Sequence, residues 1–505
     1  MKKAVKTITI IGGGISGLSA GIYAQKNGFE SVILEKHSLA GGQCTGWNRQ
    51  GYHIDGCIHW LSGTKADSDL NKLWHEVGAL DGVEIIHPES FMCFEHDGQR
   101  AYIYRDLERL QQSWCELSPE DADFIEEFCG DVRSVQSFSF PVDKPSDMMG
   151  LGEKIKMMLS MKEAGRILGK YGKMTLTEFA ERFTHPALRE GFASMAPEQY
   201  NAAMIFFAIA AFTTDEASIP AGGSRALAQR MAERYQSLGG RLETGCEVDS
   251  LEISGRSVTG IVDRKGRHWH SDYFIAACDA HFVYHDLLQG RYNDPAFEKR
   301  FTQPDIYPLA SEILVAIGFN GRIDELSEPL PWSVNYPIDP ICVGAREIER
   351  LTLKHFSHEP GFAPEGSTLL VYDINQFHED YNAWAAMDTA TYKAEKQRIG
   401  EEVIAATEAR FPAMRGRLSL LDVATPRTYE RYCNAYRGAF MAFFPSVKGK
   451  MMDHSGRIKG LDNLVLSGQW LQPPGGLPIA LTSGRNAIMR LCQRQKKDFI
   501  HALSG

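Results

Sequence analysis

The sequence of 505 residues lacks the features that mark several classes of protein. Its ten cysteines form no CxxC pair and no metal-ligand spacing, so we expect no metal and favour reduced thiols in the cytoplasm. No apolar run is long enough to span a bilayer, and the residues before the first strand leave no room for an apolar signal segment. The net charge of −10 gives no reason to expect nucleic acid as a partner.

Motifs for other catalytic chemistry are also missing. No Ser-His-Asp set and no catalytic pair of carboxylates stands out, and no second GxGxxG follows a strand. We therefore expect no dedicated NADPH domain. The chain is too long for one ordinary core, and its length predicts two or three domains at roughly 150 residues each.

A dinucleotide-binding unit opens the chain. The β-branched run Thr7–Ile11 predicts a strand, the glycines Gly12, Gly14 and Gly17 follow it, and a helical stretch comes next. A second apolar strand ends on Glu35, eighteen residues beyond Gly17. A GxGxxG motif alone is weak, but the strand, the helix and the acid at this distance make it specific.

Each residue of this unit has a physical role. Gly12 permits a tight turn, Gly14 lets the backbone approach a pyrophosphate, and Gly17 lets helix and strand pack closely. The pyrophosphate lies at the positive end of the helix. Glu35 accepts hydrogen bonds from both ribose hydroxyls and disfavours a 2′-phosphate. The unit predicts a bound dinucleotide without separating NAD from FAD.

Two further glycine pairs extend the pattern. Gly41-Gly42 and the segment Gly51-Tyr52-x-x-Asp55 follow the second strand, where an NAD enzyme usually has a helix. Near the C-terminus, Gly475-Gly476 opens a helix after a short strand. This order of motifs resembles the large FAD-binding group that contains amine oxidases and phytoene desaturases. It is most similar to the branch of bacterial phytoene desaturases, carotene isomerases and retinol saturases.

The resemblance implies FAD as the cofactor and assigns residues to it. It implies that Gly41 and Gly42 meet the pyrophosphate and ribityl, that Val248 holds the adenine through its backbone, and that the loop of residues 55–60 passes close to the isoalloxazine ring. At the helix that begins near Gly475, backbone amides point their positive end at the flavin pyrimidine edge and stabilise negative charge on the reduced ring.

The sequence departs from these relatives at two positions. Gln43 stands where desaturases usually carry Arg, and Gln469 stands where relatives usually have Asp. The residues expected to bind the cofactor are Gly12, Gly14, Ile15, Ser16, Gly17, Glu35, Lys36, Gly41, Gly42, Gln43, His59, Val248, Gly468, Gln469, Gly475, Gly476, Leu477 and Pro478.

His59 is the first candidate for a catalytic residue. The resemblance places its loop beside the ring, and an imidazole exchanges protons near neutral pH. The alternative is a pocket histidine whose hydrogen bonds are simply satisfied, and both interpretations stay open.

The expected fold class is α/β, with a Rossmann-type FAD-binding domain built on a doubly wound parallel sheet and a mixed α+β cap domain that binds substrate. We expect the discontinuous FAD-binding domain to comprise residues 1–63, 218–295 and 455–505. Residues 64–217 and 296–454 then form the cap, whose strands allow an antiparallel sheet over the flavin.

Two segments of the cap favour a lipophilic ligand. Between Lys154 and Lys173 lie six basic residues and one acid, interleaved with methionine, leucine and isoleucine. Such a basic amphipathic helix can lie on the anionic inner face of a membrane, or it can form a solvated lid over a methionine-rich pocket, and both interpretations stay open. Ala202–Phe212 is an apolar run too short to cross a bilayer, which predicts a buried helix lining the cavity.

The function that follows is that of an FAD-dependent oxidoreductase acting on carbon–carbon bonds of a lipophilic, isoprenoid or polyene-like substrate. Desaturation needs an electron acceptor, saturation needs a donor, and isomerisation needs reduced flavin, so the direction and the electron partner stay open, as does the oligomeric state. Two alternatives are a flavin amine oxidase and a non-catalytic prenyl-binding protein of the same fold.

Overall fold

The computed structural model describes residues 5–139 and 141–501. Its first layer is a five-stranded sheet of order β10-β2-β1-β14-β20, in which every neighbouring pair is parallel. Residues 8–11 of β1 are buried, as a parallel sheet covered on both faces requires. The predicted parallel sheet is confirmed. Its strands are β1 (Thr7–Ile11), β2 (Glu30–Leu34), β10 (Arg241–Glu243), β14 (Tyr273–Ala276) and β20 (Leu464–Leu466).

The expectation that no signal segment precedes the first strand rests partly on residues 1–4. These four residues lie outside the described residues.

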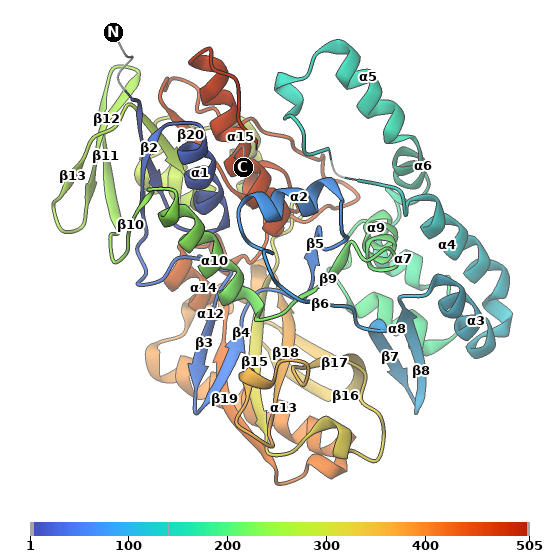
Figure 1. Cartoon of the computed structure of the whole chain (residues 1–505). Helices are drawn as coiled ribbons and strands as arrows, with labels where there is room; N and C mark the ends of the chain where they lie inside the picture. Colours follow the sequence, from blue (N-terminus) through green and yellow to red (C-terminus); the bar gives the residue numbers. More distant parts are fainter. Residues whose placement is uncertain (1–4, 140, 502–505) are drawn as a thin grey trace.

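Helices cover both faces of this sheet (Figure 1). Helices α1 (Ile15–Lys26), α10 (Gly223–Ser237) and α15 (Gly476–Arg494) share one hydrophobic core with residues such as Ile10. Ile11, on the opposite side of β1, belongs to a second core that includes the π-helix η3 and helix α11. The bounds of these two helices are Phe282–Leu287 and Pro295–Thr302.

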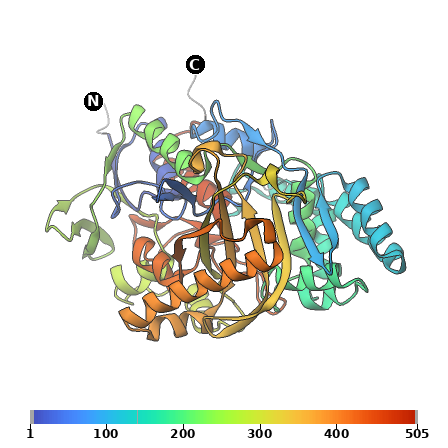
Figure 2. The ribbon, with the colours of Figure 1, turned by 90° about the horizontal axis from the view of Figure 1, so that it is seen from below.

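A three-stranded antiparallel sheet follows β10. It consists of β11 (Val248–Ser254), β12 (Ser257–Asp263) and β13 (His268–Trp269). Both views of the ribbon place this sheet at the opposite end of the molecule from helices α3 (Leu107–Leu117) and α4 (Ala122–Ser134) (Figures 1 and 2).

The cap is built around a seven-stranded sheet of order β19-β15-β18-β17-β16-β7-β8. The expected antiparallel pairing holds for every neighbour except β16 and β7, which are parallel. The long helix α13 (Thr389–Arg410) packs on one face of this sheet. The strands are β7 (Ser90–His96), β8 (Gln99–Tyr104), β15 (Ser311–Phe319), β16 (Ser333–Val343), β17 (Arg346–His355), β18 (Thr368–Gln376) and β19 (Leu418–Ala424).

A cluster of helices forms the rest of the cap. The predicted buried helix is α9 (Ala203–Phe212), which lies in an aromatic-rich core with α3, α4 and their neighbours. The remaining elements are β3 (Gly46–Arg49), β4 (Tyr52–Asp55), β5 (Leu61–Ser62), α2 (Asp69–Glu76), β6 (Ile85–Ile86), α7 (Leu176–Ala180), α8 (Pro186–Ser194), β9 (Ala217–Pro220), α12 (His378–Ala386) and α14 (Pro426–Cys433).

The basic segment forms two helices rather than the single amphipathic helix that its composition predicts. Helix α5 (Leu151–Ser160) ends at Met161, and α6 (Lys162–Tyr171) begins after it. The break lets α6 bury Tyr171 against Phe206 of α9, with ring centroids 4.2 Å apart, while α5 has no buried residue. Among the described residues, no helix is long and apolar enough to cross a membrane.

We propose that the domain boundaries follow the division expected above. Every strand of the parallel sheet lies in residues 1–63, 218–295 or 455–505, and every strand of the seven-stranded sheet lies in residues 64–217 or 296–454. The small sheet β5-β9-β6 bridges the two parts, because its strands come from both sides of the boundaries.

Candidate active site

One large cavity joins the two parts of the molecule. Its volume is about 1700 Å³, above the roughly 300–1,000 Å³ of ordinary small-molecule sites. It begins at the glycine motif after β1, passes the start of α15, and continues between α5, α6 and α9 and the seven-stranded sheet.

Backbone rather than side chains forms the nucleotide end of this cavity. Gly14 and Gly41 form an isolated parallel β-bridge, and a Cβ atom on Gly42 would lie 3.2 Å from the Cα of Gly14. Gly12 has φ +98°, and a Cβ there would lie 2.7 Å from the Ala277 carbonyl oxygen. Glycine at these positions keeps the turn closed and the cavity open.

Glu35 lies where the sequence predicts, at the end of β2 in the cavity wall. Its Oε2 accepts a hydrogen bond of 2.7 Å from the Gly13 amide, and its Oε1 accepts one of 2.7 Å from the His37 amide. Burial raises the pKa of Glu35, and these amides act in the opposite direction by favouring the carboxylate. The acid is thus fixed at the edge of the glycine turn.

Two helices point their N-termini into the cavity. Neither Gly14, before α1, nor Gly475, before α15, supplies a side-chain cap, and both helix starts line the cavity. Behind them, Ser16 Oγ lies 2.6 Å from Ser467 Oγ and 3.2 Å from Ser483 Oγ, which ties α1 to the end of β20 and to α15.

Three of the expected cofactor residues hold other parts of the chain. Gln43 donates to the Ala439 carbonyl at 2.8 Å, and Lys36 donates to Asn434 Oδ1 at 2.6 Å. The Gln469 Oε1 accepts from the Gly476 amide at 3.0 Å and so fixes the start of α15.

The cavity brings nearly all the expected cofactor residues together. Only Gly17 does not line it; its missing Cβ would overlap the Gly12 carbonyl oxygen, so this glycine permits close packing of α1 on the turn. The expected residues that line the cavity are Gly12, Gly14, Ile15, Ser16, Glu35, Lys36, Gly41, Gly42, Gln43, His59, Val248, Gly468, Gln469, Gly475, Gly476, Leu477 and Pro478.

His59 belongs to a loop that is anchored to α10. The buried carboxylate of Asp55 accepts hydrogen bonds from the amide of Ser224, at 2.6 Å, and from its hydroxyl. The Ser224 hydroxyl in turn accepts from the Ile58 amide at 2.8 Å. A Cβ on Gly223 would overlap the Asp55 carboxylate, so glycine is required there to admit this contact.

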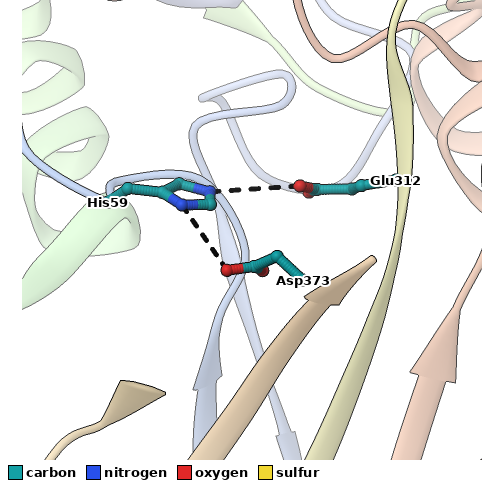
Figure 3. A group of neighbouring side chains, drawn as sticks. All are labelled: His59, Glu312 and Asp373. Carbon is teal, nitrogen blue, oxygen red and sulfur yellow. Dashed lines mark ion pairs between the residues drawn. The ribbon is translucent and has the colours of Figure 1, made fainter. Parts of the chain in front are cut away.

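His59 lies beside Glu312, Lys354, Asp373 and Tyr429, and we name these five residues the charged cluster. Its Nδ1 lies 3.5 Å from Asp373, and its Nε2 lies 4.0 Å from Glu312, as Figure 3 shows. The Lys354 ammonium contacts both His59 Nδ1 and Asp373. The Tyr429 hydroxyl donates to Glu312 at 2.6 Å.

Burial and charge fix the protonation states in the charged cluster. Burial, reinforced by the Lys354 ammonium, lowers the pKa of His59 to about 4. Burial, reinforced by the Asp373 charge, raises the pKa of Glu312 to about 8. Although burial opposes it, the Lys354 ammonium lowers the pKa of Asp373. At pH 7 the imidazole is therefore neutral, Glu312 retains its proton, and Asp373 is ionised.

The ligand atoms of His59, Glu312 and Asp373 lie within 4.8 Å of one another, which is a spacing that a metal site uses. The chain supplies its own cation there, because the Lys354 ammonium contacts two of these three groups. We interpret the group as an ion-pair cluster.

The sequence predicts only His59 of the charged cluster as a site residue. Glu312, Lys354 and Asp373 come from β15, β17 and β18, and register pairing alone places their side chains together. For Glu312 and Asp373 the only signal in the sequence is a single charged residue in a mostly apolar strand, which is a costly arrangement unless the charge is paired; β17 carries several charges, so Lys354 does not stand out.

The residues present fit FAD. The cradle of Gly14, Gly41 and Gly42 leaves room for a phosphate group against the α1 amides, and the Glu35 carboxylate lies beside it. A second helix start, at Gly475, lines the same cavity further along. A dinucleotide with a ring system at its far end matches this sequence of groups.

Comparison with known proteins agrees with this assignment. The model of the family "Flavin containing amine oxidoreductase" matches residues 15–491. The phytoene desaturase (lycopene-forming) of Pantoea ananas is 22% identical, over 95% of this chain and 98% of its own. The all-trans-retinol 13,14-reductase of Macaca fascicularis is 22% identical, over 86% of this chain and 76% of its own.

The fold is shared with solved structures. An oxidoreductase from Methanosarcina mazei superposes with a TM-score of 0.60 at 16% identity, covering 95% of this chain and 99% of its own. The match to the family model spans nearly the whole chain, including Gly41, Gly42 and most of α15. The chain therefore belongs to the flavin containing amine oxidoreductase family, and it is an FAD-dependent oxidoreductase.

Proposed function

We propose that this oxidoreductase acts on carbon–carbon bonds of a lipophilic, polyene or isoprenoid-like substrate, by desaturation, saturation or redox-dependent isomerisation. The observation that carries the proposal is the single cavity, which runs from the glycine cradle to apolar side chains such as Met161, Met204 and Phe207. Relatives named for desaturating or reducing polyenes support it over an amine substrate.

Bound FAD supplies hydride transfer at N5, and the chain supplies position and protons. The apolar side chains of α9 exclude water and hold the carbon skeleton. The Asp55–Ser224 contacts hold the loop of His59, which we propose as the acid–base residue. Because its pKa is lowered to about 4, His59 does not exchange protons near neutral pH as a free imidazole would; at pH 7 it is a neutral, weak base, and the proton that the charged cluster can donate is on Glu312.

Product analysis tests the proposal. Holoprotein with oxidised FAD, and holoprotein reduced under anaerobic conditions, would each be mixed with a polyene panel and the products separated by chromatography. We expect a product with one double bond more, one fewer, or one changed in geometry. His59→Gln should slow formation of that product while leaving the bound FAD in place.

The same preparation tests the alternatives. Rapid reduction by amines with release of hydrogen peroxide would favour an amine oxidase. A protein that binds a prenylated peptide but takes up no FAD would favour the non-catalytic alternative. Either result contradicts the proposed function.

We propose in addition that α5 and α6 rest on an anionic membrane surface. Leu151, Met158 and Leu159 of α5 are 78%, 66% and 68% exposed, and with Ile155 they recur at the spacing of one helix face. The flanking basic side chains complement anionic headgroups. Met157 and Leu168 of the same helices line the cavity, so a lipophilic substrate could pass from the bilayer into it.

Sedimentation with vesicles tests this contact. We expect binding to vesicles containing phosphatidylglycerol, weaker binding to phosphatidylcholine alone, and loss of binding when Leu151, Met158 and Leu159 are changed to Ser. The control is Lys393→Met at an exposed position of α13, far in sequence from α5 and α6. Equal binding of the native and triple-Ser proteins would contradict the proposal.

A further inference from the structure

Two cysteines face each other at the open end of the β3–β4 hairpin. Gly46 pairs with Asp55, and a hydrogen bond of 3.0 Å between the next residues along the two strands continues this register. One place further along, the register puts Cys44 opposite Cys57. Residues directly opposite each other in antiparallel strands have Cα atoms roughly 4.5–5.5 Å apart, within the roughly 4.4–6.8 Å that a disulfide spans. The backbone therefore permits a disulfide between them.

The two side chains are free thiols that contact each other. The hydrogen bond with Cys57, together with burial, raises the pKa of the Cys44 thiol well above its usual range. Cys44 is 2% exposed, and its Sγ also donates to the Ser224 carbonyl oxygen at 3.4 Å, whereas Cys57 is only partly buried. Because the reactivity of a thiol follows its access and its thiolate character, Cys57 is the sulfur that a reaction partner meets first, and Cys44 is the one that completes a disulfide.

Both cysteines line the large cavity, between its two ends. On one side, the Cys44 amide donates to the carbonyl of Gly41, in the glycine cradle, at 3.1 Å. On the other side, Cys57 lies two residues before His59 of the charged cluster. The pair thus lies between the groups assigned to the pyrophosphate and those assigned to proton chemistry, and the proposed function uses neither thiol.

We propose that Cys44 and Cys57 form a redox-active pair that passes two electrons to the bound FAD. The two S–H bonds break and one S–S bond forms; both electrons and one proton go to FAD, which becomes the anionic reduced cofactor, and the second proton is released to solvent. A small dithiol that enters the cavity restores the two thiols by thiol–disulfide exchange and is itself oxidised to a cyclic disulfide.

The pair thereby provides the electron source that saturation and isomerisation require. This inference goes beyond the proposed function, because it holds for any substrate of the reduced cofactor.

Reduction of FAD by a dithiol tests the inference in the absence of any substrate. Dithiothreitol is added to the holoprotein under anaerobic conditions, and the loss of the absorbance of oxidised FAD is followed. We expect reduction in the native protein to be at least about tenfold faster than in Cys57→Ser or Cys44→Ser, because serine forms no disulfide. The matched control Cys342→Ser changes an exposed cysteine of β16 and should behave as the native protein does.

Peptide mapping of the native protein gives a second measurement that needs no variant. Holoprotein oxidised with diamide is blocked with iodoacetamide and digested, and we expect a disulfide that links Cys44 to Cys57 and disappears after treatment with dithiothreitol. A disulfide between Cys57 and Cys433, a third cysteine in the cavity wall, would overturn the pairing.

Three further results would overturn the inference. They are equal rates of FAD reduction in the native protein and either cavity variant, no reduction of FAD in the native protein, and free thiols at both positions after oxidation. Each of these results leaves the proposed function standing, because no polyene takes part in either measurement.

Discussion

The two ends of the cavity differ in what forms their surface: backbone at one end and side chains at the other. At the nucleotide end, backbone amides, glycines and the carboxylate of Glu35 from short stretches of chain form the surface. At the substrate end, side chains from strands and helices separated by up to hundreds of residues form it, as the contact between His59 and Lys354 illustrates. The first end suits a cofactor of fixed shape, and the second can be adapted to a substrate by exchanging side chains.

The largest effect should come from adding a methyl group to a tightly packed glycine at the nucleotide end. Gly17→Ala would drive a Cβ into the Gly12 carbonyl, so we expect loss of bound FAD and destabilisation of about 3 kcal/mol, measured by FAD content and by denaturant unfolding. The matched change Gly130→Ala in α4 meets open space and should stabilise by up to about 1 kcal/mol. Similar behaviour of the two variants would contradict the packing role.

At the substrate end, Lys354→Met removes one partner from a buried ion pair. We expect a loss of about 3 kcal/mol in the free energy of unfolding, because Asp373 is left as an uncompensated buried charge. Adding Asp373→Asn should recover most of that loss, whereas Lys393→Met at an exposed position of α13 should change stability by less than about 0.5 kcal/mol. Denaturant unfolding measures all three, and no recovery in the double variant would contradict the pairing.

A smaller and more local effect is expected at Glu35. Removing the carboxylate in Glu35→Ala should weaken FAD binding by about tenfold to a hundredfold, as for the loss of a charged hydrogen-bonding group. The control Glu30→Ala lies at the exposed start of the same strand. Equilibrium titration of apoprotein with FAD measures both, and an unchanged affinity in Glu35→Ala would show that the acid does not face the ribose.

The remaining effect is a pH dependence at the substrate end. Since the pKa of Glu312 is raised to about 8, the folded protein binds one more proton than the unfolded chain between about pH 4.5 and 8, so this group lowers stability as pH rises through that range. Glu312→Gln should remove this contribution, and its Tm relative to the native protein should rise with pH. A difference in Tm that is flat from pH 5 to 8 would contradict the raised pKa.

The same contrast explains what could be predicted from the sequence. The glycines and Glu35 act through short-range backbone geometry, which leaves a motif, and such local patterns correctly predict the parallel sheet and α9. FAD rather than NAD follows only from the resemblance to a known family. The charged cluster depends on register between strands far apart, which leaves no motif. The sequence does not predict the break at Met161, because basic and apolar residues alternate in the same way on both sides of it. The break accompanies tertiary packing, in which Tyr171 of α6 is buried against Phe206.

The most direct test of the account is whether the two ends share one cavity. Purified holoprotein would be titrated with a non-reactive polyene alcohol while the visible spectrum of FAD is recorded. The account predicts a saturable change in the FAD spectrum that reaches its limit at one ligand per chain. A ligand that binds without changing the spectrum, or a protein that holds no FAD, would contradict it.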